Sequence, residues 1–460
     1  MRIPYFKQFN TSLYWNLIDS VGTQILLLMH HMLVRLFLGP AFHGSFSCIL
    51  SFLYLGIMLF NFGFDLTLAP FFTAITASKH HFIKLLRYYM LSQALILALG
   101  LLVISLLHAH LFYTSIVFDR VLYTLFGYTF IFESVKKTAK FFLQLNFLNK
   151  ITALVEILGM LCYLLLFWTI YRIGSITTVT HTWGVLAVVS TIQAGILLYW
   201  CYQLYSRLPN QDESTTMQSI SLYDVTKLRF FTFSNQLVVQ LFSGNFLVPL
   251  CAFKLGAQQA SFIKIVSSFS QILSTVAQKI FGIASNAVFA HITTKPLAER
   301  RETFSSLSYK LHQAIYALGI FLIINIRPLI TTYHQWHLGG EISLASWAIV
   351  YVFFILSFIE SFFALYERWY TVEKRADIFF VFNLLSFIIL YVLLPSINID
   401  KLFFTLLVGI RLGMFVALSG FSFYYWKIKP TFKINKSLLI VTIVSALVFN
   451  ILLTIATSVA

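Results

Sequence analysis

The chain has 460 residues, of which 59% are hydrophobic and 10% are charged, and its mean hydropathy is +0.84. A soluble protein of this length cannot bury so much apolar surface, so the composition predicts a polytopic membrane protein. The net charge of +16 would suggest nucleic-acid binding in a soluble chain. Here the basic residues stand in short segments between apolar runs, which indicates membrane topology instead, and we expect no nucleic-acid partner.

The cysteine and histidine patterns do not predict a metal site. The four cysteines all lie in apolar runs and form no C-x-x-C pair, so neither a disulfide nor a metal site is indicated. The neighbouring His30 and His31 lie about 100° apart around a helix and cannot both face one cavity. We therefore expect no metal and no cofactor.

Thirteen apolar runs are long enough to cross a hydrocarbon core of about 30 Å. They cover residues 13–37, 44–68, 85–107, 113–133, 151–172, 182–204, 230–253, 260–290, 311–333, 343–366, 377–397, 402–425 and 437–458. The predicted fold class is therefore an all-α polytopic membrane protein with about 13 transmembrane helices.

The distribution of basic residues predicts the orientation in the cytoplasmic membrane. With a cytoplasmic N-terminus, 23 of the 32 lysine and arginine residues fall in the inner segments, as the positive-inside rule requires. The longest polar stretch, Arg207 to Arg229, then lies in the cytoplasm. Its Pro, Asn, Asp, Glu, Ser and Thr content predicts a linker between an N-terminal lobe (1–206) and a C-terminal lobe (230–426), with an extra C-terminal helix in 427–460.

The two predicted lobes begin with a similar pattern, which suggests an internal duplication. Arg35 precedes Leu38-Gly39 at the end of the first span, and Lys254 precedes Leu255-Gly256 at the end of the seventh. In each case a short link then leads into a long second helix. The position of the pattern at the start of each half favours a repeated unit.

The eighth span, Phe262 to His291, carries polar side chains at steps of three and four, which align on one face of a helix. These residues are Lys264, Ser267, Ser268, Gln271, Ser274, Thr275, Gln278, Lys279, Ser285 and Asn286. A charge in hydrocarbon costs roughly 2.5 kcal/mol or more, so this face must contact protein or water. Hydrogen bonding between helices is one explanation, and the two lysines favour a water-filled cavity lined with cations.

Polar stripes also occur in spans one, two and seven. Asn61 and Asp65 end a stripe in the second span, Gln240 lies on one in the seventh, and Asp19 lies on one in the first. Four such helices, facing one another, would enclose a polar cleft between the lobes. Asp19 and Asp65 are the candidates for binding a coupling proton or sodium ion.

Several segments resemble the polysaccharide flippase branch (Wzx-like) of the exporter superfamily that also holds MATE drug exporters and MurJ-type lipid II flippases. Leu33–Pro40 (LVRLFLGP) with His43–Phe46 is similar to that branch's R-x-LGP-x-x-x-G turn, and Phe60–Asp65 is similar to its NxG segment. Leu145–Gly159 is similar to its fourth-to-fifth helix junction. The resemblance implies two pseudo-symmetric six-helix lobes, a central cavity lined by helices one, two, seven and eight, and alternating access. Thirteen spans differ from the twelve or fourteen usual there.

The resemblance implies a polyprenyl pyrophosphate-linked oligosaccharide as the partner, carried by a monomer among membrane lipids. Such a head group cannot cross hydrocarbon unaided and needs a polar, cationic path. We expect this path to be lined by Lys264, Gln271, Lys279, Arg411, Asn61 and Gln240. Arg411 has an alternative explanation, a structural ion pair with Glu360 of the tenth span.

Three other functions were compared with translocation of a lipid-linked oligosaccharide during surface polysaccharide biosynthesis. The chain has no G-x-x-x-x-G-K-[ST] motif, so it is not expected to bind ATP. A membrane glycosyltransferase, polymerase or ligase would usually present catalytic residues in a sizeable outer loop, and none is predicted, so we expect no enzyme. The serious alternative is a MATE-type cation-coupled exporter of small molecules, whose cavity would need acidic rather than basic residues.

The topology is tested with reporter fusions placed after Gly256 and after Ala460. Both reporters should be extracytoplasmic, because thirteen spans and a cytoplasmic N-terminus put these two positions outside. A cytoplasmic signal at Ala460 would remove one span from the prediction.

Overall fold

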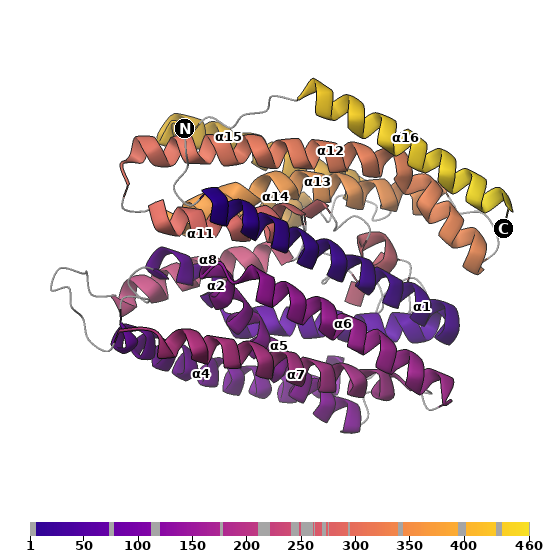
Figure 1. Ribbon diagram of the computed structural model, residues 1–460, viewed down its shortest axis with the longest axis horizontal. Helices are drawn as coiled ribbons and strands as arrows, with labels where there is room; N and C mark the ends of the chain where they lie inside the picture. Colours follow the sequence, from indigo (N-terminus) through magenta and orange to yellow (C-terminus); the bar gives the residue numbers. More distant parts are fainter. Residues whose placement is uncertain are drawn as a thin grey trace.

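The computed structural model describes residues 6–72, 78–111, 120–174, 178–209, 221–240, 248–249, 261, 263–268, 273–274, 276–292, 295–338, 344–393, 402–428 and 435–459. Within some helical segments the description covers the backbone but not the side chain, and Asp65, Gln240 and Lys279 belong to this group. Throughout the described ranges the regular structure is helical, and the long helices run roughly side by side (Figure 1).

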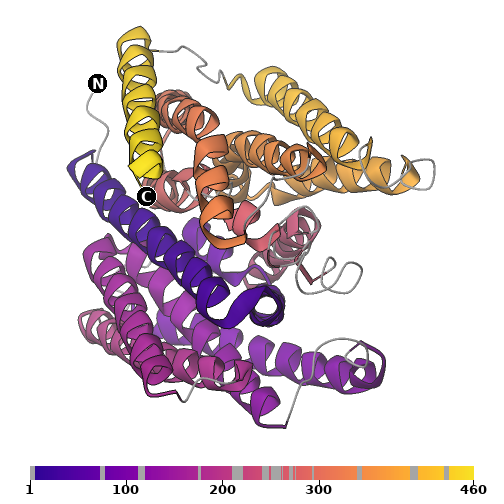
Figure 2. The same cartoon turned by 90° about the vertical axis from the view of Figure 1, so that its right-hand side faces the viewer.

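The helices form two groups that follow the order of the chain (Figures 1 and 2). The N-terminal bundle consists of α1 (Phe6–Asn61), α2 (Phe64–Leu68), α4 (Lys79–Leu111), α5 (Arg120–Leu145), α6 (Asn149–Arg172) and α7 (Val179–Ser206). The C-terminal bundle consists of the π-helical segment η2 (Val276–Gly282), α11 (Ile283–Ile292), α12 (Leu297–Leu338), α13 (Leu344–Val372), α14 (Ala376–Leu393), α15 (Leu402–Trp426) and α16 (Lys436–Val459). Between them, α8 (Leu222–Gln240) packs against both α2 and α14.

The predicted fold class is confirmed, because each of the thirteen predicted spans overlaps a described helix. Six stretches are long and apolar enough to cross a membrane by length and composition. They are Lys7–Met58, Asn149–Arg172, Val179–Ser206, Leu297–Thr331, Val350–Val372 and Val408–Trp426. Several boundaries differ from the prediction: α5 continues to Leu145, α8 begins at Leu222, inside the expected linker, and α12 begins at Leu297.

The first two predicted spans form one long helical run that is broken at Gly39. Gly39 has φ 85° and ψ 164°, and Pro40 begins the second half of α1. A positive φ is costly for a residue with a Cβ and free for glycine, and proline suits the first turn of a helix. The Leu-Gly-Pro sequence therefore makes the turn that the spans require.

The second half of α1 provides apolar contact between the N-terminal bundle and later parts of the chain. Phe46, Ile49 and Leu53 belong to one buried cluster with Ile265 and Phe353 of the C-terminal part of the chain. Burial of this surface holds the bundles together in the described conformation.

A close backbone contact joins the bundles at the end where α1 finishes and α8 begins. Gly63 has φ 70°, and a Cβ built on it would lie 2.8 Å from the carbonyl oxygen of Arg229 and 2.9 Å from the backbone nitrogen of Phe233. Glycine is thus needed both for the backbone conformation and for the approach of α8.

The buried side chain of Arg229 adds to this contact between α8 and the end of α1, which we call the Gly63 joint. Its guanidinium donates hydrogen bonds to the carbonyl of Phe62 (3.3 Å) and to the hydroxyl of Ser92 on α4 (2.8 Å). Rings of Phe62, Phe64 and Tyr88 lie within 5.3–5.4 Å of its guanidinium carbon. The contacts satisfy carbonyls that the end of a helix leaves without intrahelical partners.

Replacement of Gly63 tests the joint. Gly63→Ala should lower the free energy of unfolding by about 1–2 kcal/mol from the positive φ alone, with a further loss from the contact with α8. Gly413→Ala is the matched control, because a Cβ there meets no atom within 4 Å. Thermal unfolding of the purified variants in detergent gives the comparison, and equal melting temperatures would contradict the proposed role of Gly63.

Candidate functional site

A cavity of about 440 Å³ lies among the two halves of α1 and the helices α5, α6 and α7. Ile283 of α11 also contributes to its wall, so the cavity reaches the C-terminal bundle. Its polar and ionisable lining residues are Asp19, Thr23, Gln24, His30, Tyr54, Glu133, Lys136, Lys137, Lys140, Gln144, Glu156, Tyr163 and Gln193. Seven of these lining residues are Asp, Glu, Lys or His, and one predicted site residue, Asp19, is among them.

One face of α5 supplies the lysines of the cavity. The topology predicted from the sequence assigns Lys136, Lys137 and Lys140 to the cytoplasmic segment that follows the fourth span. In the structure all three belong to α5 and line the cavity. Their spacing from Glu133 and Gln144, at steps of three and four, puts them on one helical face. Paired charges allow α5 to continue where hydropathy alone predicts that the span has ended.

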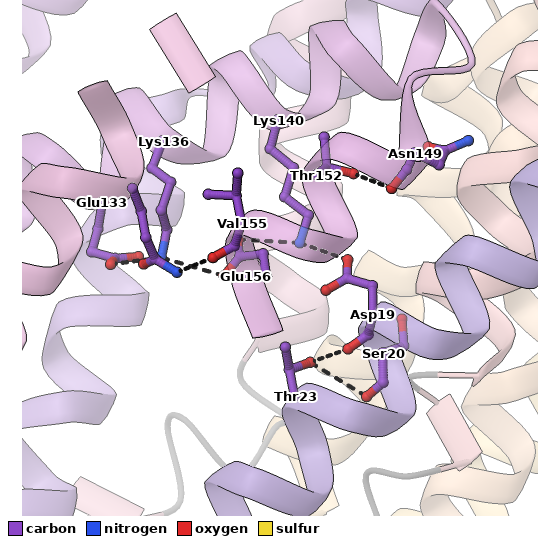
Figure 3. Close-up of polar contacts among 11 residues, drawn as sticks. Asp19, Ser20, Thr23, Glu133, Lys136, Lys140, Asn149, Thr152, Val155 and Glu156 are labelled. Atoms are coloured by element: carbon purple, nitrogen blue, oxygen red, sulfur yellow. Dashed lines mark hydrogen bonds and ion pairs between the residues drawn. The ribbon is translucent and has the colours of Figure 1, made fainter. Parts of the chain in front are cut away.

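Lys140 lies between carboxylates from two other helices (Figure 3). Its Nζ is 2.8 Å from Oδ2 of Asp19 on α1 and 3.2 Å from Oε1 of Glu156 on α6. The side chain of Asp19 is 7% exposed and that of Lys140 is 21% exposed. Two of the three N–H donors of the ammonium thus point to Asp19 and Glu156. Lys140 and both carboxylates also line the cavity.

Lys136 forms the second half of this network (Figure 3). Its Nζ is 2.8 Å from Oε1 of Glu133 and 3.6 Å from Oε2 of Glu156, and it donates to Oε1 of Gln193 at 3.1 Å. The hydroxyl of Ser190 on α7 donates to Glu133 at 2.5 Å. Glu156 therefore bridges the two lysines, and the network spans four helices.

The sequence pattern indicated one residue of this network, Asp19, on a polar face of the first span. Glu133 pairs with Lys136 of its own helix, whereas Glu156 pairs with lysines of another helix. The lysines were missed as cavity residues, although their helical spacing from Glu133 was a usable signal.

The predicted stripe of the eighth span is mostly buried where it is described, and only Ser274 and Gln278 of its described side chains are partly exposed. Lys264, Ser267 and Ser268 are almost inaccessible, and both serine hydroxyls donate to the carbonyl of Lys264, at 2.9 and 2.8 Å. These two serines thus satisfy backbone groups of their own helix. Farther along, Asn16 of α1 donates to the carbonyl of Ile280 in η2 at 3.5 Å, which places the stripes of the first and eighth spans against each other.

The remaining predicted residues of the two stripes can be placed only in part. The backbone of Lys279 lies in η2, a widened helical turn of the kind that often marks functional positions. Gln271 lies outside the described residues, as do the side chains of Gln240 and Asp65. Asn61 is buried, and its backbone carbonyl accepts hydrogen bonds from Arg229 and Gln93 in the joint with α8.

A histidine pair joins the bundles near the start of the second half of α1. His31 and His43, from the two halves of α1, are 3.0 Å apart through Nδ1 and Nε2. Nδ1 of His43 is 2.8 Å from the hydroxyl of Ser261. The two joints therefore lie near the two ends of the same helical span, and both connect the N-terminal bundle to later helices.

Arg411 lies in a buried network of the C-terminal bundle. Its guanidinium donates to Oε1 of Glu360 at 2.5 Å and to Oδ1 of Asn383 at 2.6 Å, and its side chain is 0% exposed. Asn383 in turn donates to Oδ1 of Asn235 at 2.6 Å. Arg411 therefore has Glu360 as its carboxylate partner in this conformation, as the ion-pair explanation predicts. A guanidinium that is removed from water requires such a counter-charge.

Comparison with known proteins identifies the fold. No known family profile matches the sequence, and no curated protein does. The crystal structure of the eukaryotic MATE transporter AtDTX14 is similar with a TM-score of 0.62 and 13% identity, over 96% of this chain and 98% of that one. A crystal structure of a MATE in complex with MaL6 is similar with a TM-score of 0.57 and 10% identity, over 97% of each chain. The protein thus has the MATE transporter fold over nearly its whole length, as the sequence resemblance implied.

The role of the Arg411–Glu360 pair is tested by removing one of its two charges at a time. Arg411→Met and Glu360→Gln should each destabilise the protein by about 3–5 kcal/mol, because each leaves a buried charge without its partner. The double variant should recover most of the folded protein. Thermal unfolding and size-exclusion chromatography measure the effect.

The matched control for this test is the exposed pair of Arg375 and Asp377, whose atoms are 3.1 Å apart. Arg375→Met should cost less than about 1 kcal/mol, since exposed pairs contribute little. Single Arg411 and Glu360 variants that are as stable as the unaltered protein would show that the pair is not structural.

Proposed function

We propose that the protein translocates a lipid-linked, pyrophosphate-bearing oligosaccharide across the cytoplasmic membrane by alternating access. The observation that carries this proposal is the charged cavity, where Lys136 and Lys140 are held by carboxylates on neighbouring helices. The MATE transporter fold supports the alternating-access part of the proposal. The cargo class is supported by the chemistry of the cavity.

The cavity lining suits a hydroxyl-rich, anionic head group. Gln24, Gln144 and Gln193 can exchange hydrogen bonds with sugar hydroxyls, and Tyr54 and Tyr163 offer ring faces. Lysine ammonium groups bind phosphate oxygens as point charges. A cargo loaded from the cytoplasm would reach this cavity early, because Lys140 lies only five residues before the end of α5, or about 8 Å along the helix.

The geometry suggests how cargo binding is coupled to an ion. Asp19 and a cargo phosphate would compete for the ammonium of Lys140, because both are anions that need the same donors. When phosphate takes Lys140, Asp19 loses its counter-charge and gains affinity for a proton or a sodium ion. The return of Lys140 to Asp19 would then release both ligands, so Asp19 is the coupling residue in this proposal.

The eighth span completes the proposed path on the other side of the cavity. Lys264, Gln271 and Lys279 share one stripe of the sequence, and α1 packs against η2, which contains Lys279. We assign these residues, with Gln240, to later contacts of the head group as the bundles move. Asp65 is kept as a second coupling candidate, and Arg411 is assigned no phosphate contact while it is bonded to Glu360.

The second candidate function is a MATE-type cation-coupled exporter of small molecules, because the protein shares the fold of MATE transporters. A cationic drug would need carboxylates that can accept its charge. In the described cavity Asp19, Glu133 and Glu156 each lie within 3.6 Å of a lysine. A cationic drug would therefore have to displace an ammonium group, which makes this candidate weaker.

Proteoliposomes distinguish the two functions. They would contain a fluorescent polyprenyl pyrophosphate oligosaccharide, and dithionite added outside would report how much probe has changed leaflet under an imposed proton or sodium gradient. The unaltered protein should move the probe, and Lys140→Gln should slow it about tenfold or more, because one charge-assisted hydrogen bond is lost. Asp19→Asn should remove the dependence on the gradient.

Two variants serve as controls. Lys295→Gln changes an exposed lysine that pairs with Glu299 at 4.0 Å and should not alter the rate. The double variant Asp19→Asn with Lys140→Gln removes both charges together, so it should fold and remain inactive. Uptake of a cationic dye by the same vesicles, without movement of the lipid-linked probe, would support the small-molecule exporter and overturn the proposal.

A further inference from the structure

A second, apolar cavity lies on the other side of α5. Its volume is about 490 Å³, and it is formed by α4, α5 and α7 with the aromatic side chain of Phe64 at one side. Val135, Ala139 and Phe142 of α5 line it, whereas Lys136 and Lys140 of the same helix face the charged cavity. One helix therefore separates an ionic site from a hydrocarbon-like one, which we call the apolar groove.

The apolar groove is open toward the lipid side of the bundle. Met90 of α4 and Tyr202 of α7 line it and are 61% and 63% exposed, while Phe142 at its base is buried. Three polar groups of its wall are already bonded: the hydroxyls of Tyr89 and Thr138 are 2.9 Å apart, and the thiol of Cys201 donates to the carbonyl of Ala139 at 3.6 Å. A ligand here gains from apolar contact and needs no hydrogen bond from the wall.

A lysine stands at the end of the groove where α4 begins. Lys79, Ile83, Leu86 and Met90 follow at steps of four, three and four, so they form one stripe along α4. The Nζ of Lys79 lies 5.8 Å from the ring centre of Tyr205, which lines the groove from α7. The cation thus lies where the anionic head group of a lipid would be, and the apolar stripe lies where its acyl chain would be.

The length of the groove fits one membrane leaflet. Its lining on α4 runs from Phe82 to Met90, which is about 12 Å of helix, against a half-thickness of about 15 Å for the hydrocarbon core. With the predicted cytoplasmic N-terminus, the start of α4 and the end of α7 lie at the inner surface. Anionic lipids are enriched in that leaflet and attract lysines close to it.

We propose that the apolar groove is a binding site for an anionic phospholipid of the cytoplasmic leaflet, with one acyl chain in the groove and the phosphate at Lys79. The site is separate from the charged cavity, and it does not depend on the identity of the transported cargo. A bound lipid would fill the space between α4, α5 and α7 and brace the face of α5 opposite Lys136 and Lys140.

The test is photo-crosslinking of the purified full-length protein with two lipids that carry the same diazirine acyl chain. One probe is phosphatidylglycerol and the other is phosphatidylcholine, and labelled peptides are mapped by mass spectrometry. Phosphatidylglycerol should label the groove segments of α4 and α7 about fivefold more strongly, which corresponds to one lysine contact at a membrane surface. Lys79→Ala should reduce this labelling to the phosphatidylcholine level.

Two further changes separate the groove from general lipid contact. Met90→Trp combined with Leu198→Trp fills the mouth and should remove labelling by both probes, whereas Leu158→Trp, on the exposed face of α6, should not. Lys84→Ala is the matched control for charge, because Lys84 is an exposed lysine on α4 outside the stripe. All variants are compared at equal amounts of protein that elute as folded on size exclusion.

Two outcomes would overturn the proposal. One is labelling of the groove segments equal to that of the α6 lipid face and unchanged in Lys79→Ala. The other is displacement of the probe by a polyprenyl phosphate but not by unlabelled phosphatidylglycerol, which would assign the groove to the chain of a transported lipid. Neither outcome bears on the proteoliposome result, so the two proposals succeed or fail independently.

Discussion

A charge in the interior of a membrane protein needs a counter-charge, and this constraint organises the N-terminal bundle. Lys140 on α5 is held by Asp19 on α1 and Glu156 on α6, and Lys136 adds Glu133 and a link to α7. Removing one partner leaves a desolvated charge, so the helices are held in one arrangement by the need to stay paired. The cavity exists because these long side chains meet around a space that they do not fill.

The same constraint has a different consequence in the C-terminal bundle. The side chain of Arg411 is 0% exposed and is enclosed by Glu360 and Asn383, whereas the side chain of Lys140 is 21% exposed at a cavity. The guanidinium of Arg411 is fully enclosed, so it has no route to exchange its partner, although the side chain of Glu360 is 16% exposed. In an ion pair at a cavity wall, the ammonium group can leave its carboxylate and bind an incoming anion. For this reason we assign cargo binding to the N-terminal bundle.

Alternating access requires the bundles to separate at one end while they stay joined at the other, and the structure provides two unlike joints. At one end Arg229 binds backbone carbonyls among aromatic rings and Gly63 admits α8. At the other, His43 links His31 to Ser261. The first joint has a permanent positive charge, since arginine does not deprotonate. The second is a chain of side-chain hydrogen bonds without an arginine, so the two joints are held by different interactions.

The sequence alone determined the class of the protein, because apolar runs long enough to cross a bilayer are typical of membrane proteins. It also located the turn at Gly39 and a polar helical face that includes Asp19. It could not determine which charges meet. Hydropathy ended the fourth span before Lys136 and Lys140, since a charge counts against a span unless its partner is known, and two of the partners, Asp19 and Glu156, lie on other helices. Arg411 was left with two explanations for the same reason. Only the tertiary structure decided these points, because the cost of a buried charge depends on what stands within about 4 Å of it.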